Sequence, residues 1–528
     1  MDAHHSAGCD SVSHVMEKTM GRIQQAKKNI AFGFISNLVI LVMNFLQRTI
    51  FIYLFGKTVA GVNGLFTGIL SMLSMAELGI GTAMNYSLYK PVAERNYEKI
   101  KSYMRLYKKA YMAIAGVITV IGLCLVPFLK YLVKNPGDLT VRELTTYYLI
   151  FLFNTVSTYF VAYKYSLVNA EQRNYIQTNI TTITKIVSFG VQILVLLLTK
   201  SFLWYLLAQA AVELIQKIFV SRYLNKLYPY LLDKNVRKLQ KEETDVVVNK
   251  TKALMCHKIG DVARLQTDSI IISSFIDVGV NGIVDNYNYI ITYVANFVNI
   301  IFNSVLSGFG NLVATESKEK QYEVFKVYRF FACWLYGFAT IGFWYLLTPL
   351  IGNLWLTPDW IIGQGIVTLI LVDFYFKGGR VVLANFKIAA GVFEKDRYLA
   401  LIQGGVNLVL SIGLVQVIGL AGIYVGTVIS GVMANVIQPL IVYHDCFDRR
   451  AFSYFTDSLK YMVVIAGIGG ILWPVHSLIL QEINFLTFAA MAVAITAVYN
   501  GIFLLIFYRT PEFKYLWNAM MGKFRRKA

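Results

Sequence analysis

Long stretches of the chain contain no charged residue. Three of the clearest are 186–199, 461–474 and 485–507. About 20 apolar residues in a helix cross the roughly 30 Å hydrocarbon core of a bilayer. Only helices and closed barrels satisfy their backbone inside lipid, and the apolar residues here lack the two-residue alternation of a barrel strand. The pattern therefore predicts membrane-spanning helices.

The hydropathy pattern predicts about fourteen such helices. The first apolar segment is long enough to span, so it does not read as a cleavable signal. The predicted fold class is an all-α polytopic membrane protein. The approximate limits of its spans are 29–54, 62–86, 107–130, 143–168, 176–198, 202–221, 253–276, 284–312, 327–350, 362–390, 398–416, 421–444, 459–478 and 485–508.

The segments between the spans alternate between strongly and weakly basic. By the positive-inside rule the basic side is cytoplasmic. We therefore expect the protein to lie in the cell membrane with both termini in the cytoplasm. The alternative reading of the basic segments is a specific site for lipid headgroups. The basic side holds Arg22, Lys27, Lys28, 90–109, Arg173, 222–252, 318–329, Lys395, Arg397, Arg449, Arg450, Lys460 and 523–527, and the opposite side holds Lys57, Lys130, Lys134, Arg142 and Lys200.

Composition narrows the function classes. Of the 528 residues, 56% are hydrophobic and 15% are charged, whereas a soluble domain carries roughly a quarter charged residues. The basic segments account for the net charge of +19, so no nucleic-acid partner is expected. The five cysteines are scattered and predict neither a disulfide framework nor a metal site. The outward segments are short and show no nucleophile–base constellation, so neither an enzyme nor a cofactor is expected.

Two short motifs recur at a nearly constant offset. Asn96–Lys101 (NYEKIK) resembles Gln321–Lys326 (QYEVFK), and Glu171–Tyr175 (EQRNY) resembles Glu394–Tyr398 (EKDRY). The offset equals six spans. Because six is even, the repeats keep the same orientation and predict two parallel halves related by an axis along the membrane normal.

The repeat predicts two parallel six-helix bundles plus two C-terminal helices. The predicted parts are a cytoplasmic N-terminal tail at 1–28, an N-terminal bundle at 29–223, a basic cytoplasmic connector at 224–250, a C-terminal bundle at 251–445, two additional helices at 446–508 and a basic cytoplasmic tail at 509–528.

The seventh predicted span is the richest in ionisable residues. His257, Asp261, Arg264 and Asp268 are spaced by three or four residues and share one helical face. Such residues are costly in lipid, so the face lines a wet cavity or pairs internally. The second reading is a structural ion pair of Asp261 with Arg264. Asp261 and Asp268 are the candidates for coupling to H+ or Na+.

Other spans add a surplus of positive charge. Asp373, Lys377 and Arg380 share a face in the tenth span, while Arg48 lies in the first and Glu77 in the second. The alternative for the last two is an ion pair between them. A cationic cavity suits an anionic substrate, because Arg binds phosphate oxygens bidentately. The candidate substrate-binding residues are Arg48, Glu77, Arg264, Lys377 and Arg380.

Two further groups within spans have simpler explanations. Lys217 lies near the inner end of its span and is expected to snorkel toward the interface. The glycine pairs Gly378–Gly379 and Gly404–Gly405 are expected to allow close helix packing, with a hinge as the alternative.

The sequence resembles the polysaccharide-flippase (O-antigen or capsular repeat-unit transporter) family of the multidrug/oligosaccharidyl-lipid/polysaccharide exporter superfamily. Stretches between about residues 28 and 445 carry the resemblance. They are Gly61–Pro91 (GVNGLFTGILSMLSMAELGIGTAMNYSLYKP), His257–Tyr289 (HKIGDVARLQTDSIIISSFIDVGVNGIVDNYNY), Phe302–Leu312 (FNSVLSGFGNL), and Gly391–Leu401 followed by Asn407, Leu408 and Ser411. The chain departs from the family pattern at Asp261 and Arg264, where small or polar residues are usual.

The resemblance implies fourteen helices in two bundles around a V-shaped cavity, acting by alternating access. It implies transfer of an undecaprenyl-diphosphate-linked oligosaccharide repeat unit from the inner to the outer leaflet, for export of a surface polysaccharide. The expected partners are this substrate and membrane lipids, and the protein is expected to be a monomer. Two alternatives remain. They are a small-molecule exporter of the same superfamily, which usually has twelve spans and an acidic cavity, and a membrane enzyme, which needs a larger outer loop.

Substituting Arg48, Arg264 and Arg380 one at a time is expected to slow export of repeat units, because each guanidinium is expected to bind the diphosphate. The rate of repeat-unit export measures this. A normal rate in all three variants would contradict the cationic-cavity mechanism.

Overall fold

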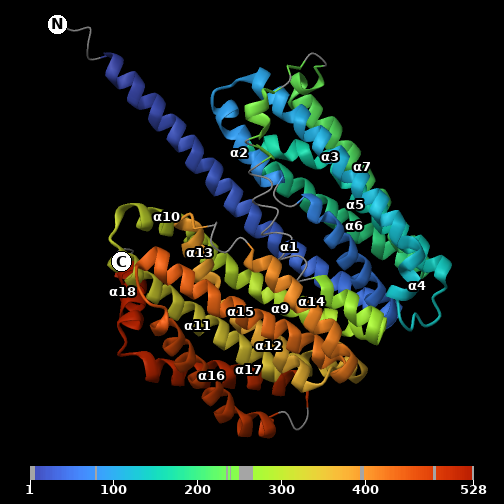
Figure 1. Cartoon of the computed structure of the whole chain (residues 1–528), viewed down its shortest axis with the longest axis vertical. Coiled ribbons are helices and arrows are strands. Elements are labelled where there is room, and N and C mark those ends of the chain that lie inside the picture. The colour runs from blue at the N-terminus through green and yellow to red at the C-terminus, as the bar shows by residue number, and fades with distance from the viewer. Residues whose placement is uncertain are drawn as a thin grey trace. The chain divides into compact units, whose positions relative to one another are not determined.

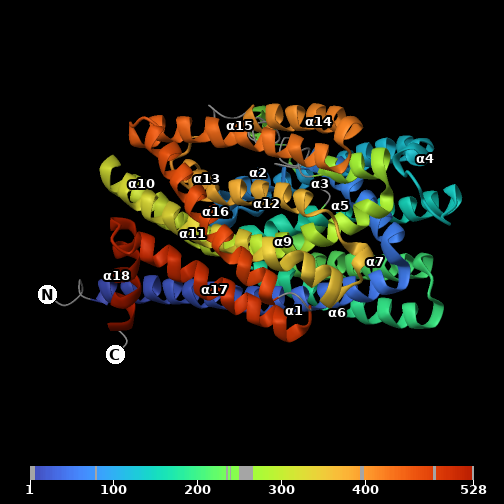
Figure 2. The same ribbon diagram turned by 90° about the horizontal axis from the view of Figure 1, so that it is seen from below.

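The structure, a computed structural model, describes residues 6–77, 80–233, 236–237, 239–245, 247–248, 266–392, 398–479 and 483–525. Every regular element within these ranges is helical (Figures 1 and 2). The predicted all-α class is therefore confirmed.

The chain folds into two compact units, which are described separately. Unit 1 comprises Met1–Gly56, Phe66–Leu132 and Pro136–Lys258. Unit 2 comprises Lys57–Leu65, Val133–Asn135 and Ile259–Ala528.

The helices of unit 1 pack mainly as neighbours in sequence. Helix α3 packs on α5, α5 on α7, and α6 on α7, while α2 packs on both α3 and α5. Asn96 caps α3, and Thr140 and Glu143 form a capping box at the start of α5. The elements are α1 (Ser6–Leu73), η1 (Ser74–Glu77), α2 (Ile80–Ala93), α3 (Tyr97–Leu125), η2 (Val126–Phe128), α4 (Leu129–Leu132), α5 (Val141–Ala170), α6 (Asn174–Thr199), α7 (Phe202–Leu227) and η3 (Pro229–Leu232).

Unit 2 repeats this packing order. Helix α11 packs on α12, α12 on α15, and α14 on α15, and the last pair runs side by side in both views (Figures 1 and 2). This order matches α3, α5, α7 and α6, as the sequence repeat predicts. The elements are η4 (Ile272–Ile276), α9 (Val278–Ser304), α10 (Leu306–Thr315), α11 (Lys318–Pro349), η5 (Leu350–Trp355), η6 (Pro358–Trp360), α12 (Gln364–Gly379), α13 (Val381–Ala389), α14 (Leu399–Ile418), α15 (Leu420–Phe447), α16 (Phe452–Ile479), α17 (Phe485–Phe507) and α18 (Pro511–Arg525).

The two additional helices, α16 and α17, pack against α11 within unit 2. An aromatic core joins them: Phe330 of α11 packs on Phe503 of α17, and Tyr345 of α11 donates its hydroxyl to the Gly469 carbonyl oxygen of α16. All three rings are nearly fully buried. Burying rings of this size removes 150–250 Å² each from the surroundings and dominates such interfaces.

Eleven helices in the described ranges are long and apolar enough to cross a membrane. Large apolar side chains lie exposed on their outer faces, such as Leu198 at 76% and Val417 at 79%. Exposed apolar surface on this scale suits lipid rather than water. The chain is therefore a multi-pass membrane protein.

Several predicted spans are interrupted. In the span predicted at 62–86, α1 ends at Leu73 and the 3-10 turn η1 follows over Ser74–Glu77. The span predicted at 362–390 is divided at Arg380, where α12 ends and α13 begins. The connection predicted between 54 and 62 is helical apart from Gly56, whose φ of 70° is readily adopted only by glycine. Most of the seventh predicted span lies outside the described residues, so the count of fourteen stays a prediction.

The neighbouring glycines Gly378 and Gly379 offer a matched test of helix packing. A Cβ on Gly378 would come within 2.1 Å of the buried Tyr336 ring, whereas one on Gly379 would meet nothing within 4 Å. Tyr336 cannot move away easily, because its hydroxyl donates to Asn299 Oδ1 at 2.8 Å. Gly378→Ala is expected to cost about 1–3 kcal/mol of stability, and Gly379→Ala little. Thermal unfolding in detergent measures both, and equal midpoints would contradict the packing.

Candidate functional site

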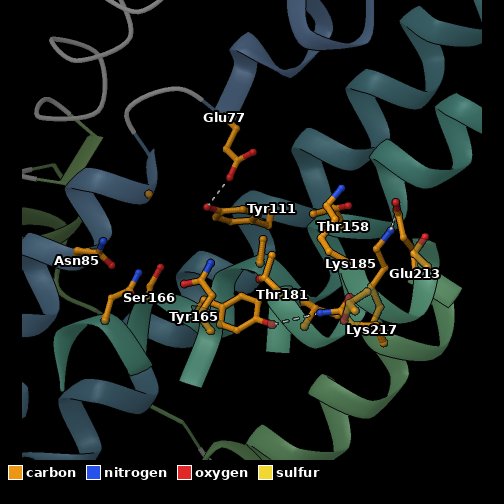
Figure 3. A pocket seen from close by; sticks show the side chains of 18 residues that line it. Glu77, Asn85, Tyr111, Thr158, Tyr165, Ser166, Thr181, Lys185, Glu213 and Lys217 are labelled. Atoms are coloured by element: carbon orange, nitrogen blue, oxygen red, sulfur yellow. Dashed lines mark hydrogen bonds and ion pairs between the residues drawn. The ribbon is translucent and has the colours of Figure 1, made fainter. Parts of the chain in front are cut away.

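Unit 1 encloses a polar cavity of about 410 Å³ between its helices (Figure 3). Its volume falls within the range of about 300–1,000 Å³ typical of small-molecule sites. Hydroxyl, amide and charged side chains supply most of its lining. The lining residues are Glu77, Gly81, Asn85, Tyr111, Thr158, Val161, Ala162, Tyr165, Ser166, Asn169, Gln177, Thr181, Thr184, Lys185, Ser188, Glu213, Gln216 and Lys217.

Two carboxylates and two ammonium groups line this cavity. Glu77 stands at the end of η1 and accepts a hydrogen bond from the Tyr111 hydroxyl at 3.0 Å, which Figure 3 shows as a dashed line. Tyr111 comes from α3 and is almost fully buried, so its ring fixes the hydroxyl beneath the carboxylate. The predicted site residue Glu77 therefore lines a cavity.

Lys217 is held inside the bundle. Its ammonium donates to the Asn154 carbonyl oxygen at 2.9 Å and to Ser157 Oγ at 2.8 Å, both on α5. It also lies 3.5 Å from Glu213, one turn earlier on α7. The expectation that Lys217 snorkels to the interface is wrong, because α7 turns this side chain toward α5 rather than toward lipid.

A chain of glutamine amides extends the polar region from α1 to α7; we call Gln47, Gln192 and Gln209 the amide chain. Gln47 Nε2 donates to Gln192 Oε1 at 2.6 Å, and Gln192 Nε2 donates to Gln209 Oε1 at 3.2 Å. Gln209 Nε2 then donates to Glu213 Oε1 at 2.9 Å. The amide donor of each glutamine is thus directed along the chain toward the Glu213 carboxylate.

Gln192 occupies the centre of the amide chain and is 1% exposed. Ser188, one turn earlier and part of the cavity lining, donates to its Oε1 at 3.3 Å. Gln47 also donates to the Tyr205 hydroxyl at 2.7 Å. Because buried polar groups are costly unless bonded, this network can persist in the bundle only as a connected set.

Lys185 is the exposed cation of the cavity. It lies on α6 with Gln177, Thr181, Thr184 and Ser188, whose spacing puts them on one helical face. Within the described part of the chain Lys185 forms no ion pair. Its ammonium is thus available to an anion in the cavity.

A second polar cluster lies in unit 2 around Asp268. Thr427 on α15 donates to Asp268 Oδ2 at 3.4 Å and receives a hydrogen bond from Asn407 Nδ2 at 2.9 Å. Asn407 Oδ1 in turn accepts from Thr267 Oγ1 at 3.4 Å. Thr267, Asn407 and Thr427 are all buried. Carboxylate, amide and hydroxyl oxygens are the ligand types that hard cations prefer.

Three further charged residues of unit 2 lie on or directly after α12. Lys377 pairs with Asp373 at 2.6 Å across one turn. Arg380 is buried at the break between α12 and α13.

The remaining predicted residues divide into two groups. Arg48 is half-buried on α1 next to Gln47 of the amide chain, and it is not among the residues that line the cavity. Asp261 and Arg264 lie outside the described residues. The amide chain was not predicted, although Gln209, Glu213 and Lys217 recur at four-residue spacing within one apolar span.

No protein-family model and no curated protein sequence matches the chain. Solved structures do. The structure titled lipid II flippase MurJ, inward closed conformation, has a TM-score of 0.63 at 13% identity over 91% of this chain and 100% of that one. An inward-facing multidrug resistance MATE family transporter of the MOP superfamily has a TM-score of 0.59 at 13% sequence identity. The match covers 75% of this chain and 92% of that one. A mutant of the Vibrio cholerae MATE transporter VcmN has a TM-score of 0.52 at 13% sequence identity, over 81% of this chain and 99% of that one. The chain shares their fold.

Lys185 and Lys217 allow a matched test of the site. Lys217→Met would leave Glu213 and two acceptors on α5 without their donor, so it is expected to cost about 2–4 kcal/mol. Lys185→Met removes an exposed ammonium and should change stability by less than about 0.5 kcal/mol. Thermal unfolding of both variants in detergent measures the difference. Equal midpoints would show that Lys217 is not held as described.

Proposed function

We propose that this protein is a transporter that moves an undecaprenyl-diphosphate-linked oligosaccharide from the inner to the outer leaflet by alternating access. The observation that carries the proposal is the polar cavity enclosed within unit 1 of a membrane-spanning helical fold. A substrate with sugars and a charged diphosphate needs such a lining, because lipid solvates neither. Among proteins of the same fold, one is titled a lipid II flippase.

The lining of the cavity matches the sugar part of this substrate. Thr158, Ser166, Thr181 and Thr184 offer hydroxyls, and Gln177 offers an amide. Such groups both donate and accept hydrogen bonds, as sugar hydroxyls do. The cavity therefore has the means to replace the water that surrounds a glycan in solution.

Cations within the helix bundles would bind the diphosphate. Lys185 is the exposed ammonium of the unit 1 cavity. Arg48, Lys377, Arg380 and, outside the described residues, Arg264 remain proposed contributors. A buried or half-buried guanidinium binds phosphate more strongly than an exposed one, since water competes less for it.

An apolar groove in unit 2 suits the polyprenyl chain. It measures about 470 Å³ and is lined by side chains of α9, α11 and α17. Phe297, Val298, Leu346 and Ile495 are among them, and the lining is almost wholly apolar. Because lipid tails are as apolar as this lining, a polyprenyl chain would be held in the groove by van der Waals packing.

The Asp268 cluster is the proposed site of ion coupling. The Asp268 carboxylate accepts a hydrogen bond from the Thr427 hydroxyl, and carboxylate and hydroxyl oxygens suit Na+, while the carboxylate alone suits a proton. Asp261 stays a second candidate outside the described residues. Binding of a cation there would change the charge within unit 2 and so bias its conformations.

A small-molecule exporter of the same superfamily is the second candidate. The carboxylates of Glu77 and Glu213 in the unit 1 cavity favour it, since a cationic drug would pair with them. The two candidate functions predict different effects of losing the protein. Loss of a flippase leaves lipid-linked repeat units on the inner leaflet, and loss of a drug exporter does not.

Deletion of the gene, with assay of sealed membrane vesicles by a leaflet-selective glycan probe, tests the proposal. Accumulation of lipid-linked repeat units on the inner leaflet is the expected result. Lys185→Met should restore transport at less than about a tenth of the normal rate, since a charged hydrogen bond contributes about 1.5–3 kcal/mol. Lys226→Met, an exposed lysine on α7 outside the cavity, should restore it fully. If lipid-linked repeat units do not accumulate on the inner leaflet of the deletion strain, the flippase proposal is contradicted.

Ion coupling has its own test. Transport in vesicles with an imposed Na+ or pH gradient is expected to depend on one of the two. Asp268→Asn should abolish that dependence, because it removes the charge that attracts the cation. Asp359→Asn, a change at an exposed carboxylate of η6, serves as the control. If transport by the Asp268→Asn variant still depends on the gradient, the coupling site is not Asp268.

A further inference from the structure

A second and larger cavity lies in unit 1, at the end of the bundle where α3 begins and α7 ends. Its volume is about 760 Å³. Side chains of α3, α5, α7 and the segment that follows α7 enclose it. The residues that line it are Lys101, Met104, Arg105, Lys108, Lys109, Met112, Phe160, Tyr163, Lys164, Ser221, Asn225, Leu231, Leu232, Asp233 and Val236. None of these lines the cavity that holds Glu77 and Lys185.

Basic residues dominate this second cavity, which we call the basic pocket. Lys101, Arg105, Lys108 and Lys109 follow one face of α3 at spacings of four, three and one residues. Lys164 of α5 adds a fifth positive charge, and Asp233 is the single carboxylate in the lining. The pocket therefore carries a strong net positive charge.

The inner part of the basic pocket is firmly built. Lys164 is 6% exposed, and its ammonium donates to Ser221 Oγ at 2.9 Å and to Asn225 Oδ1 at 2.8 Å. Both acceptors are neutral, so they orient the ammonium without cancelling its charge. Lys101 is paired with Asp233 at 2.9 Å and with Glu98. The positive charges of Arg105, Lys108, Lys109 and Lys164 are not compensated by the lining itself.

The segment after α7 closes the pocket by binding to α3. Ser102 Oγ donates to the Arg237 carbonyl oxygen at 2.7 Å, and Arg105 donates to the Val236 carbonyl oxygen at 3.2 Å. Lys99 pairs with Glu243 at 2.7 Å, and this hydrogen bond holds the pKa of the Glu243 carboxyl below its ordinary value. The segment after α7, which forms this side of the pocket, therefore has a defined position at neutral pH.

The outer part of the basic pocket offers free cations next to apolar side chains. Lys108 and Lys109 are exposed, and within the described residues neither forms an ion pair. Met112 and Phe160 also line the pocket, and Met112 belongs to the apolar run 110–129 that directly follows Lys109. This combination of ammonium groups with an apolar border is what the membrane interface presents to an amphiphile.

We propose that the basic pocket binds the phosphate headgroup of an anionic glycerophospholipid, with the acyl chains lying against Met112, Phe160 and the apolar part of α3. The shared chemistry is that of a phosphate anion, which a lipid or a soluble phosphate can supply. The apolar border favours the lipid. Such a lipid would bridge Lys108 of α3 and Lys164 of α5. The proposal does not depend on what the protein transports.

Titration of the purified full-length protein in detergent with a short-chain phosphatidylglycerol tests the proposal, with bound lipid counted by native mass spectrometry. The pocket variant is Lys108→Gln with Lys109→Gln. It is expected to weaken binding about 30-fold, since each basic residue near an anionic lipid contributes about 1 kcal/mol. The matched control, Arg222→Gln with Lys226→Gln, removes the same charge from exposed positions of α7 outside the pocket and should bind normally.

The source of the anion is decided in the same experiment. Phosphatidylcholine and inorganic phosphate are titrated in parallel, and both are expected to bind much more weakly than phosphatidylglycerol. Equal binding of inorganic phosphate would overturn the lipid assignment in favour of a soluble anion. Unchanged lipid binding in the pocket variant, or an equal loss in the control, would overturn the site. Thermal unfolding of both variants confirms that they fold, and because transport is not measured, the result stands apart from the proposed function.

Discussion

The cost of holding a charged group inside a helix bundle in lipid governs the arrangement of this protein. An ion taken out of water loses its hydration, and only a close partner with further hydrogen bonds compensates for the loss. Lys217 has Glu213 one turn away, and Lys377 has Asp373 one turn away. Each ion pair belongs to a single helix, and Lys217 also donates to two acceptors on α5. The compensation of this charge therefore depends on the packing of α7 against α5.

The neutral polar groups follow from the same constraint. The amide chain passes hydrogen bonds from Gln47 through Gln192 and Gln209 to the Glu213 carboxylate, so each buried amide is bonded without adding charge. The cavity beside it is polar and nearly balanced in charge, which suits a glycan. The uncompensated positive charge of unit 1 gathers instead in the basic pocket. Two different tasks, handling a polar substrate and holding an anionic lipid, are in this account assigned to separate cavities of one bundle.

Hydropathy was enough to predict the helical class and most of the helices, because burial in lipid requires about 20 apolar residues whatever their neighbours. It did not predict the end of α1 at Leu73 or the break at Arg380, because neither changes the hydropathy of its segment. Counting charges identified Glu77 as a cavity residue but placed Lys217 at the interface, because the direction of a side chain depends on which helix packs beside it. The amide chain was missed because glutamines carry no charge. Asp261 and Arg264 lie outside the described residues, so their roles stay predictions.

The central claim is that the polar cavity of unit 1 carries the head of a lipid-linked oligosaccharide across the membrane. Reconstitution of the purified protein into liposomes with an undecaprenyl-diphosphate-linked oligosaccharide tests it most directly, when a membrane-impermeant glycan-binding probe reports the leaflet. The account predicts that the protein exchanges substrate between leaflets far faster than protein-free liposomes do, and that Lys185→Met slows the exchange while unfolding at the normal temperature. Exchange no faster than in protein-free liposomes, under either an Na+ or a pH gradient, would contradict it.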